Sequence, residues 1–203
     1  MTKITHLFFD LGGVCLTNGW DHLAREKAAD YFNYDYEESY ERHASAIEKF
    51  ETGQISREVY LKETVFYKKR EFTEKEFISF MESQSKAHKS SFEVLEKLRL
   101  QDKYTISAFN NESLEINLYR IEKFKLKRYF SNFFSSCFLG AKKPDLEIYQ
   151  KVLGITQIRA EHGLLIDDRE GNVKTAAECG FQTLLFPEVI DLEEKLIQKG
   201  ITL

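Results

Sequence analysis

The stretch Leu7-Phe8-Phe9-Asp10-Leu11-Gly12-Gly13-Val14 joins an apolar run to a single carboxylate and a pair of glycines. Apolar residues of high β-propensity that are bounded by turn formers predict a buried strand. Asp10 then lies at the carboxyl end of that strand, where parallel α/β sheets bind their ligands. The glycines let the main chain approach a ligand closely. The alternative is a strand and a loop in which Asp10 caps the next helix.

The composition indicates a folded protein with a substantial core. The chain has 203 residues, is 42% hydrophobic and contains two prolines. A formal net charge of -4 gives no reason to expect nucleic acid or an anionic membrane as a partner, and no feature indicates an oligomeric state. We see no signal-peptide pattern and no run long enough to span a bilayer. Cys15, Cys137 and Cys179 form no C-x-x-C pair, so we expect reduced thiols and a cytoplasmic protein.

The region from residue 17 to residue 86 is rich in Glu, Lys, Tyr and Phe at helical spacing. Asp21, Ser56 and Thr73 are typical N-cap residues, and Glu76 completes a capping box with Thr73. The helical spacing and the N-cap residues predict an all-helical insert after the first strand. We expect its helices at residues 21–31, 37–51, 56–68 and 73–86.

Strands and helices alternate after the insert. We expect helices at residues 91–100, 112–124, 144–153, 171–179 and 190–199, and strands at residues 104–109, 133–138, 163–166 and 182–186. Alternation of this kind predicts an α/β fold with a doubly wound parallel sheet and helices on both faces. The α/β core then consists of residues 1–16 and 87–203, and the insert of residues 17–86.

Two adjacent carboxylates, Asp167 and Asp168, directly follow the predicted fourth strand. Holding two such groups together near a buried strand is unfavourable without a cation or hydrogen-bond donors. Mg²⁺ fits, because it prefers a few carboxylates, a carbonyl and water as ligands. The alternative is that one of the two carboxylates caps the next helix.

Polar residues also follow the second and third predicted strands. Asn110 and Asn111 come after the second, as a simple helix cap or as donors to an anion at a helix N-terminus. Lys143 follows the third, where it is a solvated charge or neutralises a phosphate; Pro144 suits the first helical position. Together with the carboxylates, these residues predict a phosphate site with a metal. The sequence contains no P-loop, no G-x-S-x-G elbow and no dinucleotide fingerprint.

Four motifs in this order resemble those of the haloacid dehalogenase superfamily of hydrolases. They are Phe9-Asp10-Leu11-Gly12-Gly13-Val14, Ala108-Phe109-Asn110-Asn111, Gly140-Ala141-Lys142-Lys143-Pro144-Asp145 and Leu165-Ile166-Asp167-Asp168-Arg169-Glu170-Gly171-Asn172-Val173. The resemblance spans essentially the whole chain. The insert is similar to the family's small helical cap domain, in which residues 50–56 resemble a common turn. Asp-Leu-Gly in the first motif is similar to the subgroup of sugar-1-phosphate phosphatases.

The resemblance implies a phosphatase that uses Mg²⁺ and acts on a small phosphorylated metabolite, for which a sugar phosphate is one candidate. Asp10 would be the nucleophile that forms an aspartyl-phosphate. Mg²⁺ would be bound by Asp10, the Gly12 carbonyl and Asp168, with Asp167 acting through water.

The resemblance also implies which groups contact the substrate. Lys143 and Asn110 would stabilise the phosphoryl oxygens during the reaction. Asn111 and the main chain at Gly12 would help to bind the phosphate. Asp21 and Arg25, near the entrance to the cap, would contribute to substrate binding.

Two positions depart from the family pattern. Phosphatases of this family usually carry a second Asp as general acid and base where this chain has Gly12. Asp21 and His22 are candidate substitutes, although a helix cap and a solvated surface side chain are the simpler interpretation. Asn110 stands where the second motif usually has Ser or Thr, and its amide can still donate to a phosphate oxygen.

Gly12 leaves two further hypotheses open. One is a metal-independent 2-haloacid dehalogenase, in which Asp10 attacks carbon; the acidic pair Asp167-Asp168 argues against it, because dehalogenases work without metal. The other is a cap-bearing binding or regulatory protein that keeps the metal site and has lost turnover. Metal dependence and measured turnover distinguish the three.

Overall fold

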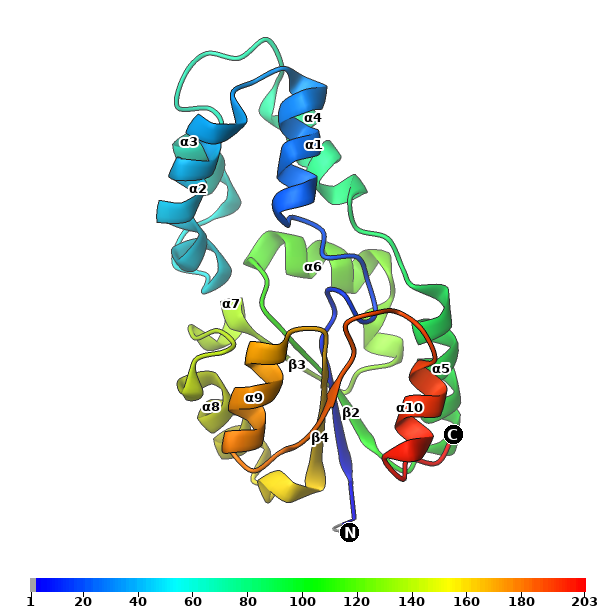
Figure 1. Cartoon of the computed structure of the whole chain (residues 1–203). Coiled ribbons are helices and arrows are strands. Elements are labelled where there is room, and N and C mark those ends of the chain that lie inside the picture. The colour runs from blue at the N-terminus through cyan, green and yellow to red at the C-terminus, as the bar shows by residue number, and fades with distance from the viewer. Residues whose placement is uncertain (1–2) are drawn as a thin grey trace.

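The computed structural model describes residues 3–203 and is built on a parallel five-stranded sheet (Figure 1). The strands are β1 (His6–Phe9), β2 (Thr105–Asn110), β3 (Asn132–Ser135), β4 (Gly163–Asp167) and β5 (Gln182–Leu185). Their order is β3-β2-β1-β4-β5, so the sheet is doubly wound and β1 lies at its centre. The predicted α/β fold class is confirmed. The carboxyl ends of β1 and β4 meet where the strand order reverses, which is where such sheets bind ligands.

Helices cover both faces of the sheet. They are α5 (Lys89–Gln101), α6 (Leu114–Lys123), α7 (Ser136–Leu139), α8 (Leu146–Thr156), α9 (Glu170–Glu178) and α10 (Leu192–Gln198), with short 3-10 turns at Leu126–Arg128 and Ala160–His162. Alternate residues of β1 point to opposite faces. Leu7 and Phe9 pack with residues of α5 and α10, and Phe8 packs with residues of α8 and α9. None of the helices in the described part of the chain combines the length and apolar character that crossing a membrane requires.

The helical insert lies above the carboxyl edge of the sheet (Figure 1). It contains α1 (His22–Phe32), α2 (Tyr36–Glu51), α3 (Arg57–Thr64) and α4 (Glu74–Ser83). The expected caps are present: Asp21 caps α1, Ser56 caps α3, and Thr73 forms a capping box with Glu76 at the start of α4. The insert has an apolar core of its own, built around residues such as Phe50, Tyr60 and Phe77.

Two local expectations are wrong. The third strand ends at Ser135, and residues 136–138 form the first part of the short helix α7 instead of continuing the strand. Gly140 ends that helix in a left-handed conformation with φ of 64°, which glycine adopts without strain. Helix α8 begins at Leu146, so Pro144 precedes the helix and does not occupy its first turn.

Arg120, on α6 of the core, contacts both chain segments that connect the insert to the core. The side chain is 1% exposed and donates hydrogen bonds to the Thr17 carbonyl at 3.2 Å and to Ser85 Oγ at 3.0 Å. Gly19 makes room for it: φ is +74°, and a Cβ atom there would lie 1.7 Å from Arg120 Nη2. The buried positive charge is balanced by Glu112, whose Oε2 is 2.9 Å from Arg120 Nη1.

We expect Arg120→Met to lower the free energy of unfolding by about 3 kcal/mol, because removing one partner of a buried ion pair leaves the other charge unpaired. Urea denaturation measures this change. A Glu112→Gln, Arg120→Met double variant should lose less stability than the sum of the two single variants. Additive losses would contradict the argument that the two charges stabilise each other.

Candidate active site

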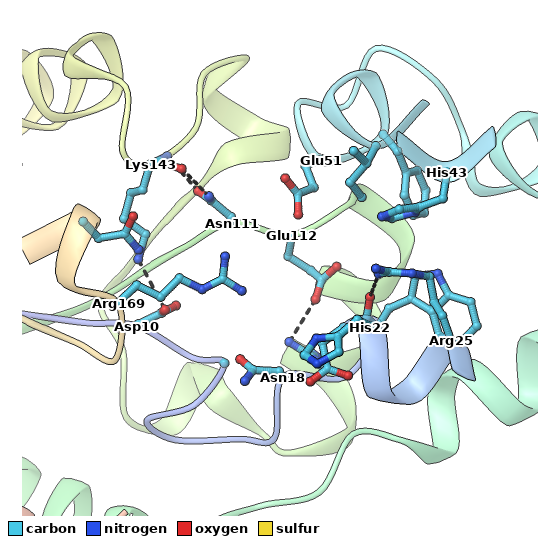
Figure 2. Close-up of a pocket in the computed structure, with 17 residues that line it drawn as sticks. Asp10, Asn18, His22, Arg25, His43, Glu51, Asn111, Glu112, Lys143 and Arg169 are labelled. Atoms are coloured by element: carbon cyan, nitrogen blue, oxygen red, sulfur yellow. Dashed lines mark hydrogen bonds and ion pairs between the residues drawn. The ribbon is translucent and has the colours of Figure 1, made fainter. Parts of the chain in front are cut away.

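A polar cavity of about 270 Å³ lies between the carboxyl edge of the sheet and the insert. Figure 2 shows Asp10, Lys143 and Asn111 on one side of it and His22, Arg25 and His43 on the opposite side. Both layers of the molecule contribute lining residues: Asp10, Gly12, Asn111, Glu112, Arg120, Lys143, Arg169 and Asn172 from the core, and Asn18, Trp20, Asp21, His22, Arg25, His43, Ile47, Phe50 and Glu51 from the insert and its first connection.

Three carboxylates meet at the sheet edge. Phe9 of β1 pairs with Ile166 of β4, so Asp10 and Asp167 come next at the same level of the sheet. Asp10, Asp167 and Asp168 each place one carboxylate oxygen within 4.8 Å of the others. Because the three sets of oxygen atoms converge, the cluster can hold a hard divalent cation.

The environment of the Asp168 carboxylate indicates that the cluster can bind a cation. Its Oδ1 is buried and has no hydrogen-bond partner among residues 3–203. Gly13 makes the approach of Asp168 possible, since φ is +73° and a Cβ atom there would lie 2.2 Å from Asp168 Oδ2. A buried carboxylate oxygen without a hydrogen-bond donor is unfavourable unless an ion or a water molecule binds to it.

Lys143 supplies a positive charge within the cluster. It is 3% exposed, and its Nζ lies 2.5 Å from Asp167 Oδ2 and 3.5 Å from Asp10 Oδ2. Burial alone lowers the pKa of Lys143, but the neighbouring carboxylates of Asp10 and Asp167 outweigh it and raise the pKa. The side chain of Asn111 fixes the main chain here, because it donates to the Lys143 carbonyl at 2.7 Å and accepts from the Lys143 N–H at 2.9 Å.

Asp167 is the best-supported carboxylate of the three. Besides Lys143, it accepts hydrogen bonds from Asn172 Nδ2 at 2.9 and 3.1 Å and from the Arg169 N–H at 2.9 Å. Asp10 has fewer partners. The pKa of Asp10 is raised to about 7, because burial and the charges of Asp167 and Asp168 together outweigh the lowering effect of Lys143. Burial, followed by the charge of Asp167, also raises the pKa of Asp168.

The raised pKa of Asp10 predicts a stability effect. Because the folded-state pKa of about 7 exceeds the ordinary value of 3.8, the folded state holds the proton more tightly. The stabilisation from this proton is complete below pH 4 and is lost as the pH rises toward 7. In chelator-treated protein we therefore expect Asp10→Asn to increase the free energy of unfolding at pH 8, by on the order of 3 kcal/mol. Thermal denaturation at pH 8 and at pH 4 tests this; an equal gain at both would contradict it.

The structure does not place all the expected site residues in the cavity. Asn110 is 1% exposed and does not line it: Asn110 Nδ2 donates to Asn117 Oδ1 at 3.2 Å, and Asn110 Oδ1 accepts from Ser135 Oγ at 2.8 Å. Asp21 lines the cavity while its carboxylate accepts from the Ala24 N–H at 2.9 Å. Arg25 also lines it, donating to the Trp20 carbonyl at 2.8 Å.

Several lining residues were not among the expected site residues. Glu51, Glu112, Arg169 and His43 all line the cavity. Glu51 lies in the turn-like stretch that resembles the family's caps, and Glu112 immediately follows Asn111; both positions carried a signal. His43 carried none, because it lies within α2 apart from the other histidines, on the buried face of that helix.

The chain belongs to the haloacid dehalogenase-like hydrolases, whose family model matches residues 4–180. Among related proteins, the chloroplastic Flavin mononucleotide hydrolase 1 of Arabidopsis thaliana is 38% identical over 109 residues. That alignment covers 54% of this chain and 44% of the Arabidopsis protein, so the chain spans less than half of its relative.

Solved structures of the same family share the fold. A HAD family enzyme of Bacteroides thetaiotaomicron has a TM-score of 0.82 at 22% identity, over 97% of this chain and 99% of that one. Its complex with magnesium and inorganic phosphate has a TM-score of 0.76 at 24% identity, over 90% and 93% of the two chains. YfnB of Bacillus subtilis, bound to magnesium, has a TM-score of 0.70 at 19% identity, over 98% and 100%.

Proposed function

We propose that this hydrolase is a Mg²⁺-dependent phosphatase that acts on a small phosphorylated metabolite through an aspartyl-phosphate on Asp10. The observation that carries the proposal is the cluster of Asp10, Lys143, Asp167 and Asp168, of which Asp10 and Lys143 line the polar cavity. Asp10 is an available nucleophile, because its carboxylate lies at the cavity surface and a cation beside it favours the ionised form.

The residues that would hold Mg²⁺ are Asp10, Asp168 and the carbonyl of Gly12, with Asp167 acting through water. A bound Mg²⁺ supplies positive charge that orients a phosphate and reduces its repulsion of the carboxylate. Asp167 is already engaged by Lys143 and Asn172, which suits a supporting role. Magnesium in the complexes of the Bacteroides and Bacillus proteins supports this choice of metal.

We expect Gly13→Ala and Asp168→Asn each to weaken Mg²⁺ binding by about tenfold or more. The first places a methyl group where Asp168 lies, and the second removes a ligand charge. Isothermal titration with MgCl₂ measures the affinity, and thermal denaturation confirms that both variants fold. Unchanged affinity in both would place the metal elsewhere.

Lys143 would neutralise the phosphoryl oxygens as charge moves onto them in the transition state. Asn111 would act by fixing the main chain of Lys143, since its amide nitrogen and its amide oxygen both form hydrogen bonds with that main chain. Asn110 lies in a separate network with Asn117 and Ser135. We therefore assign the contact with the phosphate to Lys143 and not to Asn110.

The insert would act as a cap that encloses the substrate. We take it as residues 17–86, with residues 1–16 and 87–203 as the core; residues 1 and 2 lie outside the described part of the chain. Ser136 Oγ of the core donates to the Glu51 carbonyl of the insert at 2.6 Å, so the two parts touch beside the cavity. A covered site excludes bulk water and strengthens electrostatic interactions within it.

The substrate would be an alkyl phosphate ester. Flavin mononucleotide, named for the Arabidopsis relative, is one candidate, and sugar phosphates are another, because the polar cavity lining suits a hydroxylated compound. Neither nucleic acid nor a membrane is proposed as a partner. The cytoplasmic location remains a prediction, and the relative is named as chloroplastic.

Phosphate release from a panel of phosphometabolites, with Mg²⁺ and with chelator, tests the proposal. The panel contains sugar phosphates, flavin mononucleotide and p-nitrophenyl phosphate. We expect turnover that requires the metal and that Asp10→Asn abolishes, since the nucleophile is removed.

Two outcomes would contradict the proposed function. Chelator-resistant chloride release from 2-chloropropionate would support a dehalogenase, which Gly12 allows and the acidic pair Asp167-Asp168 opposes. Mg²⁺ binding without turnover of any compound would support a binding or regulatory protein.

A further inference from the structure

Ester hydrolysis requires a proton for the leaving oxygen, and position 12 cannot supply it. Gly12 has no side chain. A Cβ atom built there would lie 2.9 Å from Asn18 Oδ1, so the Asn18 side chain fills the adjacent space. The donor must therefore be another group that lines the cavity.

Two carboxyl groups that line the cavity are already engaged. Asp21 accepts the N–H of Ala24 as the cap of α1. Glu112 Oε2 pairs with the Arg120 guanidinium at 2.9 Å, and Glu112 Oε1 accepts a hydrogen bond from the Ser113 N–H at 3.0 Å.

His43 is uncharged. Burial lowers the pKa of His43 to about 3, and its Nδ1 lies 2.7 Å from Tyr60 Oη. The imidazole therefore carries no proton that it could release near neutral pH.

Glu51 is the carboxyl group that stays available. It is the last residue of α2 and lines the cavity, with its carboxylate directed toward the cavity between the core and the insert (Figure 2). Among residues 3–203 its nearest cation is Lys142, whose Nζ is 3.8 Å from Glu51 Oε2, beyond hydrogen-bond distance.

The position of Glu51 is fixed by contacts with the core. Its carbonyl accepts the Ser136 hydroxyl at 2.6 Å. The next turn also packs tightly, because a Cβ atom on Gly53, where φ is +73°, would lie 2.6 Å from the Cys137 carbonyl. The end of α2 is thus held against α7, and the carboxyl group is held over the cavity.

The surroundings favour the protonated form of Glu51. Burial raises the pKa of Glu51 most, and the charge of Glu112 raises it further. Lys142, Arg169 and Arg25 act in the opposite direction, and the pKa remains raised. Burial raises the pKa of Glu112 as well, but Glu112 is paired with Arg120, whereas Glu51 has no cation within hydrogen-bond distance among residues 3–203.

We propose that Glu51, contributed by the helical insert, is the general acid that protonates the leaving oxygen in place of a carboxylate at position 12. This rests on the proposed phosphatase function. In the first step Asp10 forms a bond to phosphorus, the ester P–O bond breaks toward the leaving oxygen, and that oxygen takes the Glu51 proton. In the second step water attacks phosphorus, Glu51 takes a proton from the water, and Asp10 is released with inorganic phosphate.

Leaving groups of different acidity test the proposal. Alkyl esters such as flavin mononucleotide and glucose 6-phosphate need a proton at the leaving oxygen, whereas nitrophenolate leaves without one. We expect Glu51→Gln to lower kcat/KM on alkyl esters, which reports formation of the aspartyl-phosphate, by about a hundredfold or more. The same variant should lower kcat/KM on p-nitrophenyl phosphate far less and remove the alkaline decline of the alkyl-ester pH profile.

Two matched variants serve as controls. Glu48→Gln changes an exposed carboxylate one turn earlier on α2 and should alter neither substrate class. His22→Gln changes an exposed residue that also lines the cavity, and it should not show the dependence on the leaving group.

Several results would overturn the proposal while leaving the phosphatase function standing. These are an equal loss of kcat/KM on both classes in Glu51→Gln, unchanged kcat/KM on alkyl esters, a leaving-group dependence in His22→Gln instead, or wild-type hydrolysis of p-nitrophenyl phosphate alone. Absence of any metal-dependent turnover in the wild type would overturn the phosphatase function itself.

Discussion

Mutual repulsion among Asp10, Asp167 and Asp168 is the constraint on which the rest of the site depends. Parallel pairing of β1 with β4 forces the first two carboxylates to the same level, and Gly13 admits the third. The chain offsets this charge with Lys143 and with the donors around Asp167. Burial, and after it the neighbouring carboxylates, leave Asp10 and Asp168 with raised pKa values, so the charge is not fully balanced. The cluster is therefore a place where a cation can offset the remaining negative charge.

A second buried charge links the site with the insert. Glu112 reaches the cavity from the end of β2, and its partner Arg120 contacts both connections between insert and core. A buried ion pair contributes little net stability compared with apolar packing, but it is unfavourable to disrupt. Here the ion pair fixes positions. The Arg120 guanidinium binds both the Glu112 carboxylate at the cavity and the two segments that connect the insert to the core.

Much of the fold was predictable because local signals agree with the tertiary structure. Alternating strands and helices, the apolar run before Asp10 and the capping residues each specify an element by themselves. The four motifs located the carboxylates and Lys143 for the same reason. Residues 136–138 were misassigned, since an apolar run of this length fits either a strand or a helix. The orientation of Asn110 and the contacts of Arg120 depend on packing between distant segments, which no local pattern encodes.

The junction at Arg120 has a consequence for how such a chain can diversify. Thr17 and Ser85 are 68 positions apart, yet both bind one side chain, so the insert leaves and re-enters the core at a single place. The insert also has its own apolar core. Substitutions there can remodel the upper wall of the cavity without disturbing the strands that hold Asp10. The upper wall of the cavity and the strand ends that hold Asp10 are thereby inherited on separable segments of one gene product.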